Sequence, residues 1–318
     1  MERQFKFKHT NEIWTGVPIF SANMDTTGTF ETAITLQKHK MLTAIHKFYS
    51  IKDWEKNVEK LDPNFISVTV GQSKEDLQLG QKIFSLNSDI KYLCIDVANG
   101  YREDFINSVK NYRETFPDKI IIAGNVATRE MTEALILAGA DIVKIGIGPG
   151  SVCTTRSVAG VGYPQLSSIS ECSDAAHGLG GHVMADGGCK YPGDVSKAFG
   201  AGADYVMLGG MFAGHKESGG ELVTDEEGVQ YKDFYGMSST KAQQTYYGDL
   251  AEHRAPEGKK VRLRYKGELD KTVQSILGGM RSACSYVGAK KLKDLPKSTT
   301  FIRVTQTTNE IFTGSENI

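Results

Sequence analysis

Short apolar stretches alternate with segments of helical spacing along most of this chain, and this alternation constrains the fold more than any other feature. The stretches are rich in Val, Ile, Leu and Ala and are bounded by Gly, which is typical of buried parallel strands. We predict strands at 17–23, 41–45, 65–70, 92–98, 119–125, 140–146, 182–188 and 205–210. We predict helices at 29–38, 51–61, 74–85, 102–115, 129–138, 168–178, 192–199 and about 270–287. The repeated alternation predicts an α/β fold, a (β/α)8 TIM barrel.

The 318 residues suffice for one large α/β domain or two small ones, so a doubly wound sheet in two domains is the alternative architecture. The even strand spacing and the lack of a linker favour one barrel domain over 1–318. The segment at about 213–268, after the last predicted strand, is rich in Gly, Lys and Tyr, and we call it the flap. Insertions of this length are either functional or disordered. Within the flap, we expect 231–235 and 260–265 to pair as a hairpin.

Composition excludes several classes of partner. The net charge of −1 gives no signal for binding nucleic acid or an anionic membrane. No apolar stretch reaches the roughly 18 residues of a membrane span, and the start of the chain has no apolar signal core. The five cysteines are scattered and odd in number, which indicates reduced thiols in the cytoplasm rather than a disulfide framework. No Cys-x-x-Cys or His-x-x-x-His pair suggests a structural metal.

A Gly-rich loop follows the predicted strand at 140–146, and we call 148–165 the catalytic loop. Its glycines and Pro149 forbid a helix and favour a tight, unusual turn. Cys153 lies on this loop among polar neighbours, whereas core cysteines usually lie inside strands or helices. Arg156 and exposed backbone amides would lower the pKa of the Cys153 thiol toward the reactive thiolate. We therefore interpret Cys153 as a nucleophile; an inert loop cysteine is the alternative.

Residues that directly follow the strands of a barrel share one end of it, where active sites are built. Asp186 follows one predicted strand, and its carboxylate suits the two hydroxyls of a ribose. The pairs Gly187-Gly188 and Gly209-Gly210 leave backbone amides bare for a phosphate. Each signal alone is typical of an ordinary turn. Together, after consecutive strands, they predict a site for a nucleoside monophosphate.

Four stretches, 146–156, 185–188, 207–210 and 235–239, are similar to the IMP dehydrogenase / GMP reductase family, and the resemblance covers about residues 16–305. The dehydrogenases carry a regulatory domain early in the barrel, but here Lys47 leads directly into the predicted helix at 51–61. The dehydrogenase flap bears an Arg-Tyr pair that activates water. The matching segment here, His253-Arg-Ala-Pro-Glu-Gly-Lys259, resembles the reductase pattern, as do 96–100 and 123–127.

The resemblance implies NADPH-dependent reductive deamination of GMP to IMP and ammonia. Cys153 would attack C2 of the purine, and ammonia would leave as a covalent thioimidate forms. Thr155 and Glu257 are the implied proton relay to the leaving amine. The alternative for Glu257 is a solvated carboxylate beside basic neighbours. The alternative functions are NAD-dependent oxidation of IMP and a non-catalytic, truncated nucleotide-binding form.

The resemblance also implies ligand contacts. For GMP these are Asp186, Gly187, Gly188, Gly209, Gly210, Gly236, Met237, Ser238, Arg254, Ala255, Pro256, Glu257 and Gly258. For NADPH they are Lys47, Asp96, Val97, Ala98, Ile147, Gly148, Met237, His253, Arg254, Ser282, Ala283, Cys284 and Ser285. For a potassium ion they are the loop carbonyls of Gly148, Gly150, Cys153 and Arg156. A homotetramer is expected on the same ground.

The family pattern begins roughly thirty residues before this chain does, with a Ser-Arg pair that helps to bind the adenosine part of the cofactor. We therefore expect weaker NADPH binding than in a relative that has the pair. The first barrel strand is present, so we expect the barrel to close.

Overall fold

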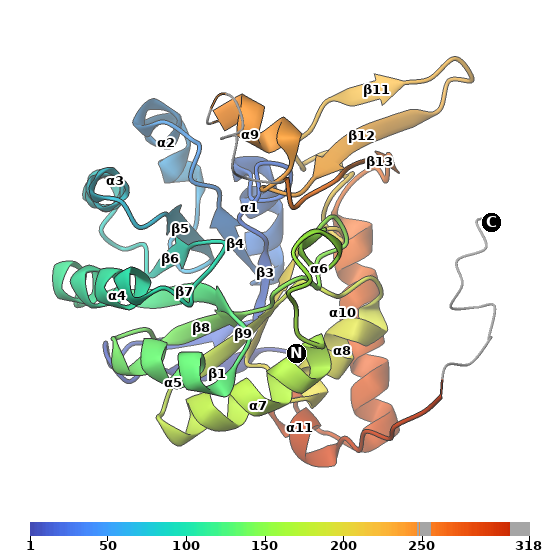
Figure 1. The fold of residues 1–318 in the computed structure, drawn as a ribbon. Helices are drawn as coiled ribbons and strands as arrows, with labels where there is room; N and C mark the ends of the chain where they lie inside the picture. Colours follow the sequence, from blue (N-terminus) through green and yellow to red (C-terminus); the bar gives the residue numbers. More distant parts are fainter. Residues whose placement is uncertain (247, 249–255, 306–318) are drawn as a thin grey trace.

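A closed barrel of eight parallel strands forms the centre of this computed structural model, which describes residues 1–246, 248 and 256–305 (Figure 1). The strand order around the barrel is β10-β3-β4-β5-β6-β7-β8-β9, so each strand pairs with its neighbours in sequence and the last closes on the first. The predicted TIM barrel is confirmed. The strands are β3 (Ile19–Ser21), β4 (Leu42–Ile45), β5 (Ile66–Val70), β6 (Tyr92–Asp96), β7 (Ile120–Val126), β8 (Ile142–Ile145), β9 (His182–Asp186) and β10 (Tyr205–Leu208).

Helices between successive strands cover the outside of the barrel. They are α1 (Phe30–Leu36), α2 (Ile51–Asn57), α3 (Lys74–Leu86), α4 (Glu103–Thr115), α5 (Arg129–Leu137), α7 (Gln165–Gly178), α8 (Pro192–Gly200) and α10 (Asp270–Val287). Local signals start and stop them. Ser50 and Ser73 form capping boxes with Asp53 and Asp76, which satisfy the first amides of α2 and α3. Gly288 ends α10 with a left-handed φ of 73°.

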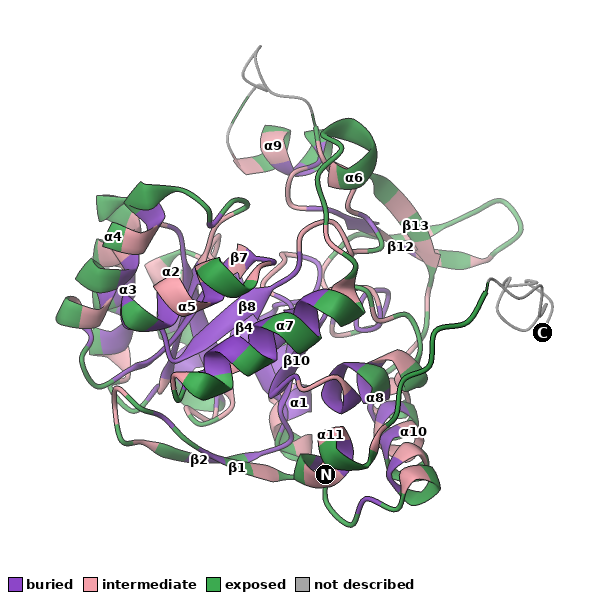
Figure 2. Cartoon of the chain, turned by 60° about the horizontal axis from the view of Figure 1, so that its bottom comes forward, coloured by how far each residue is buried: buried purple, intermediate pink, exposed green. Residues whose placement is uncertain are grey.

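Two apolar layers hold the molecule together, one between strands and helices and one inside the barrel. Alternate strand residues point to each layer, so Val143 and Ile145 of β8 face the helices while Ile142 faces the interior. The strands are therefore buried on both sides and appear purple in Figure 2. This double burial explains why they read as continuous apolar runs in the sequence.

An antiparallel hairpin, β1 (Arg3–Lys6) with β2 (Ile13–Gly16), covers the end of the barrel where the strands begin (Figure 2). Its aromatic side chains Phe5, Phe7 and Trp14 fill that end, and Phe5 stacks on Tyr205 at 4.6 Å between ring centroids. This hairpin is not among the predicted elements. We call this the amino-terminal end, and the opposite end, where the strands stop, the mouth.

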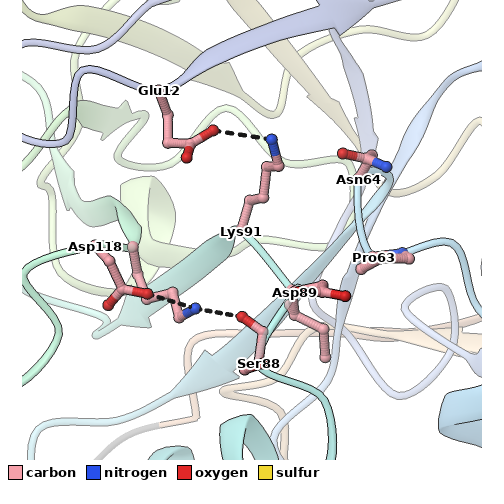
Figure 3. A pocket seen from close by; sticks show the side chains of 9 residues that line it. Glu12, Pro63, Asn64, Ser88, Asp89, Lys91 and Asp118 are labelled. Carbon is pink, nitrogen blue, oxygen red and sulfur yellow. Dashed lines mark hydrogen bonds and ion pairs between the residues drawn. The ribbon is translucent and has the colours of Figure 1, made fainter.

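A cavity of about 370 Å³ lies beside the hairpin at the amino-terminal end (Figure 3). Its lysines are already paired: Lys91 with Glu12 at 2.9 Å, and Lys119 with Asp118 at 2.8 Å. Lys119 also donates to the Ser88 carbonyl at 2.6 Å. None of the predicted site residues lines this cavity.

The flap contributes a three-stranded sheet of β11 (Leu222–Thr224), β12 (Gln230–Tyr235) and β13 (Lys260–Arg264), which projects from the barrel (Figure 1). The predicted hairpin is confirmed, because Tyr231 pairs with Arg264 and Tyr235 with Lys260. Helix α9 (Thr240–Tyr246) follows β12. The short helices α6 (Thr155–Val158) and α11 (Leu295–Ser298) complete the α-helices of the described residues. Among these residues, no helix has the length and apolar character that a membrane crossing requires.

Candidate active site

The catalytic loop leaves β8 at Ile145 and crosses the end of β9 at close range. A Cβ on Gly146 would lie 2.2 Å from the carbonyl oxygen of Asp186, so only glycine fits there. The loop then turns at Cys153, whose amide donates to the Gly150 carbonyl at 3.1 Å. Cys153 is half-buried and its thiol is free, as the nucleophile prediction requires.

Cys153, Thr155 and Glu257 form one chain of contacts. The Cys153 Sγ lies 3.2 Å from the Thr155 Oγ1, which donates to the Glu257 Oε2 at 2.7 Å. A threonine hydroxyl carries one proton, so when that proton points to Glu257, Thr155 can only accept from the Cys153 thiol. The geometry can therefore pass a proton from the sulfur to the carboxylate and back.

Backbone hydrogen bonds hold the flap against the catalytic loop and fix this chain of contacts. The Thr154 amide donates to the Glu257 carbonyl at 3.0 Å, and the Lys259 amide donates to the Val152 carbonyl at 2.9 Å. The Glu257 amide donates to the Ser238 carbonyl at 3.1 Å. Glu257 thus lies between the loop and the segment after β12, far from Cys153 in sequence but beside it in space.

The predicted phosphate glycines converge on the same loop. A Cβ on Gly187 would lie 3.1 Å from Pro149 Cγ, and one on Gly210 would lie 2.9 Å from Ser151 Oγ. The ends of β9 and β10 therefore both border the catalytic loop. Gly236 and Gly258 border it as well, since a Cβ on Gly236 would meet the Val152 carbonyl, and Gly258 bridges to Cys153. Of the other predicted GMP contacts, Met237, Ser238 and Pro256 belong to these same segments.

Asp186 lies in a network that the sequence did not reveal. Lys144 of β8 points into the barrel and donates to Asp96 Oδ1 at 2.7 Å and to Asp186 Oδ2 at 3.0 Å. It also donates to the Asn125 side-chain oxygen. Asn125 in turn donates through its amide nitrogen to Asp186 Oδ2 at 2.9 Å. The sequence feature that could have pointed to this network is Lys144 itself, a single charged residue within an apolar strand.

Electrostatics favour the charged forms of Lys144 and Asp96 in this network. Burial by itself disfavours the charged form of Lys144, but the carboxylates of Asp186 and Asp96 outweigh it and hold the pKa of Lys144 well above its usual value. Burial likewise opposes the charge on Asp96, and Lys144 overcomes this, so the pKa of Asp96 is lowered.

A second cluster that sequence patterns did not assign anchors the flap to the barrel. Tyr246 of α9 donates to Asp25 Oδ2 at 2.6 Å, and Tyr235 of β12 donates to the same oxygen. Nearby, burial lowers the pKa of His46 to about 4, so its ring is neutral. Asp25 and His46 follow β3 and β4, and their positions after strands were the signal that could have found them.

The predicted potassium ligands lie together on the loop, but the Arg156 side chain does not point to the thiol. Its guanidinium donates to the Tyr163 carbonyl at 2.6 Å. The Gly150 carbonyl accepts from Cys153 and keeps one lone pair. Within 1–246, 248 and 256–305, no group of three or more His, Cys, Asp or Glu residues could hold a metal ion. Carbonyl ligation of potassium stays a prediction.

The predicted cofactor contacts fall into three groups. Lys47, Asp96, Val97, Ala98, Ile147 and Gly148 follow or end strands at the mouth. A second group lies in the second half of α10 and consists of Ser282, Ala283, Cys284 and Ser285. Burial raises the pKa of Cys284, and the positive charge of the nearby amino terminus of the chain acts against this effect. The structure therefore does not bring these four residues to Cys153. His253 and Arg254 form the third group and lie outside the described residues, as does the predicted GMP contact Ala255.

Comparison with known proteins identifies the family. Residues 2–311 match the family model described as the IMP dehydrogenase / GMP reductase domain. A protein named GMP reductase from Buchnera aphidicola subsp. Acyrthosiphon pisum is 56% identical over 315 residues, which are 98% of this chain and 90% of the relative. GMP reductase from Caenorhabditis elegans is 54% identical over 319 residues, covering 99% of this chain and 89% of the relative. GMP reductase 2 from Mus musculus is 54% identical over 319 residues, covering 99% and 91%. The chain belongs to the IMP dehydrogenase / GMP reductase family.

Proposed function

We propose that this protein is a reductase that converts GMP to IMP and ammonia with NADPH, in purine nucleotide interconversion. One observation carries the proposal: a free thiol at the mouth of the barrel is joined through Thr155 to the flap carboxylate of Glu257. The names of the relatives support the choice of GMP as substrate.

The nucleotide would bind across the mouth. The exposed part of Asp186 would accept hydrogen bonds from the ribose hydroxyls, and the amides near Gly187, Gly188, Gly209 and Gly210 would hold the phosphate. This places the purine over the catalytic loop, with C2 within reach of Cys153. Ser238 and Arg254 are the further proposed contacts of the nucleotide.

Deamination uses a proton that the protein itself supplies. As the Cys153 sulfur bonds to C2, its proton passes through Thr155 to Glu257. The same proton then returns to the exocyclic amine, the C2–N bond breaks, and ammonia leaves. Amide ion is a poor leaving group, so this protonation is what allows the thioimidate to form. The atoms balance, because the thiol proton ends on ammonia.

NADPH, when bound, supplies the hydride that C2 needs. Asp96 is the proposed acceptor for a hydroxyl of the cofactor, because its side chain is 28% exposed at the mouth beside Asp186. Cys153 then leaves as a thiolate when IMP forms, and it regains a proton before the next cycle. By resemblance we also propose potassium on the loop carbonyls, a homotetramer and a cytoplasmic location.

Two assays run side by side test the function. GMP with NADPH should cause loss of the reduced nicotinamide absorbance and release of ammonia, whereas IMP with NAD⁺ should give no reduction. Cys153→Ser should lower the rate by at least about 10³-fold, since oxygen is a far weaker nucleophile here. Cys172→Ser, which changes a buried cysteine of α7, is the matched control and should keep its activity.

The opposite pattern would overturn the proposal. Turnover of IMP with NAD⁺ but not of GMP would indicate the dehydrogenase reaction. Nucleotide binding without turnover of either pair would indicate a non-catalytic binding protein.

A further inference from the structure

Lys144 has an unusual position for a charged residue. It lies on β8, two residues after Ile142, and therefore points into the barrel interior. The residue is 2% exposed. An ammonium group there is very costly unless it is fully paired, so its partners account for its presence.

The partners use all the donors that Lys144 has. Its three protons meet three acceptors: Asp96 on β6, Asn125 on β7 and Asp186 on β9. Asn125 also donates to the Gly146 carbonyl at 3.0 Å, which ties the network to the start of the catalytic loop. One buried cation therefore fixes groups from three other strands.

The carboxylates of Asp96 and Asp186 keep hydrogen-bond acceptor capacity beyond their contacts with Lys144. The Asp96 side chain is 28% exposed and that of Asp186 is 21% exposed, whereas the Lys144 side chain is 2% exposed. Each carboxylate thus presents acceptor capacity to the mouth, while the cation stays behind them. Asp186 belongs to the proposed nucleotide site and Asp96 to the proposed cofactor site, so the same ammonium supports both.

We propose that Lys144 is a positioning residue that holds Asp186 and Asp96 as oriented acceptors for the nucleotide and the cofactor together. This inference rests on the proposed function. Loss of Lys144 should weaken the binding of two different ligands at once, and the binding of NADPH should weaken further as the pH falls, which a purely structural role does not predict.

The pH dependence follows from the charges around the network. The carboxylates of Asp96 and Asp186 face Lys144. Lys47, which follows β4, and Asn23 also favour the ionised form of Asp96. Burial raises the pKa of Cys94 on β6 and of Cys189 after β9 to about 12, so both of these neighbours are neutral. Without Lys144, burial raises the pKa of Asp96. Binding of the cofactor is then lost as the pH falls through that raised value.

The test compares Lys144→Met with a matched variant, Lys119→Met. Lys119 is also a buried lysine, but it lies at the amino-terminal end and pairs with Ser88 and Asp118. KM values for GMP and NADPH, with kcat, are measured from about pH 8.5 to about pH 6. For Lys144→Met we expect both KM values to rise about tenfold or more, and the KM for NADPH to rise further as the pH falls. For Lys119→Met we expect both KM values to stay close to those of the wild type.

Two further variants keep the test decisive. Lys144→Arg retains a charge and should bring both KM values nearer to the wild type than Lys144→Met does. If Lys144→Met does not fold, Lys144→Gln, which donates without a charge, takes its place, and calorimetric titration with GMP reports binding without turnover.

Unchanged KM values in a folded Lys144 variant, a rise for one ligand only, or a rise in the KM for NADPH that does not vary with pH would each overturn the inference. A wild-type protein that does not turn over GMP with NADPH would instead overturn the proposed function, so the two failures are distinguishable.

Discussion

Aspartates paired with cations lie at both ends of the barrel, but they are buried at one end and partly exposed at the other. At the amino-terminal end, Asp204 binds Arg3 at 3.2 Å, His177 at 2.7 Å and the Val183 amide at 3.1 Å. Its side chain is 4% exposed. At the mouth, Asp96 and Asp186 share Lys144 and remain 28% and 21% exposed.

Asp141, also at the amino-terminal end, repeats the saturated pattern. Its Oδ2 accepts from Arg113 at 2.5 Å and from the Ile121 amide at 2.9 Å, and its Oδ1 accepts from the His9 amide at 3.3 Å. A carboxylate whose lone pairs are filled by its own chain can only stabilise the fold. A carboxylate held by a cation from behind, with acceptor capacity left over, can also bind a ligand. The comparison therefore separates the stabilising end from the ligand-binding end by acceptor saturation.

The largest expected effect concerns the mouth alone. Glu257→Gln cannot take the proton that Thr155 passes on, so we expect kcat to fall about 10²- to 10³-fold with little change in melting temperature. Glu227→Gln, in the exposed turn between β11 and β12, is the matched control in the same flap and should keep the wild-type kcat. A Glu257→Gln rate within a few-fold of the wild type would remove Glu257 from the proton relay.

A paired exchange at the two ends tests the comparison directly. Asp186→Asn should raise the KM for GMP about 10- to 100-fold, as expected for loss of a charged acceptor. It should shift the unfolding midpoint less than Asp204→Asn does, because Lys144 keeps its ion pair with Asp96. Asp204→Asn should lower the free energy of unfolding by about 3 kcal/mol, because Arg3, His177 and the Val183 amide all lose their charged partner, and should not change KM. Denaturant titration and steady-state kinetics on both variants measure this. The reverse outcome would mean that acceptor saturation does not distinguish the two ends.

The smallest expected effect is a pH-dependent contribution of the amino-terminal end to the stability of the fold. The hydrogen bond to Asp204 raises the pKa of His177 above its usual 6.5. Protonated His177 therefore stabilises the fold below pH 6.5, and this stabilisation is lost as the pH rises through the raised pKa. His177→Gln should lower the melting temperature more at about pH 6 than at about pH 8.5. An equal decrease at both pH values would contradict this assignment.

The barrel was predictable because each strand is buried on both faces and each helix carries a 3.6-residue pattern. The β1–β2 hairpin was not, because its short strands alternate Phe5 and Phe7 with charged residues and look polar overall. Its apolar face exists only against the end of a closed barrel. Helix α7 starts at Gln165, before the predicted position, since Pro164 rather than a polar cap precedes it.

The site was predictable only in part, because some of its contacts exist only in the closed barrel. Cys153, Asp186 and the glycine pairs carry local signals at the ends of strands, so their order along the chain placed them at one end of the barrel. Lys144 carries only its charge within an apolar strand, which does not identify its partners, because those on β6 and β9 are remote in sequence and become neighbours only when the barrel closes. The link from Thr155 to Glu257 came from the family resemblance, and the folded flap supplies its geometry.

Intact-mass analysis of the protein incubated with GMP and oxidised cofactor, which cannot donate a hydride, tests the role of the Cys153 sulfur. We predict a species heavier than the protein by GMP less ammonia in the wild type, and no such species in Cys153→Ser. Absence of the adduct in a wild-type protein that does turn over GMP, or its presence in Cys153→Ser, would contradict the central role of the Cys153 sulfur.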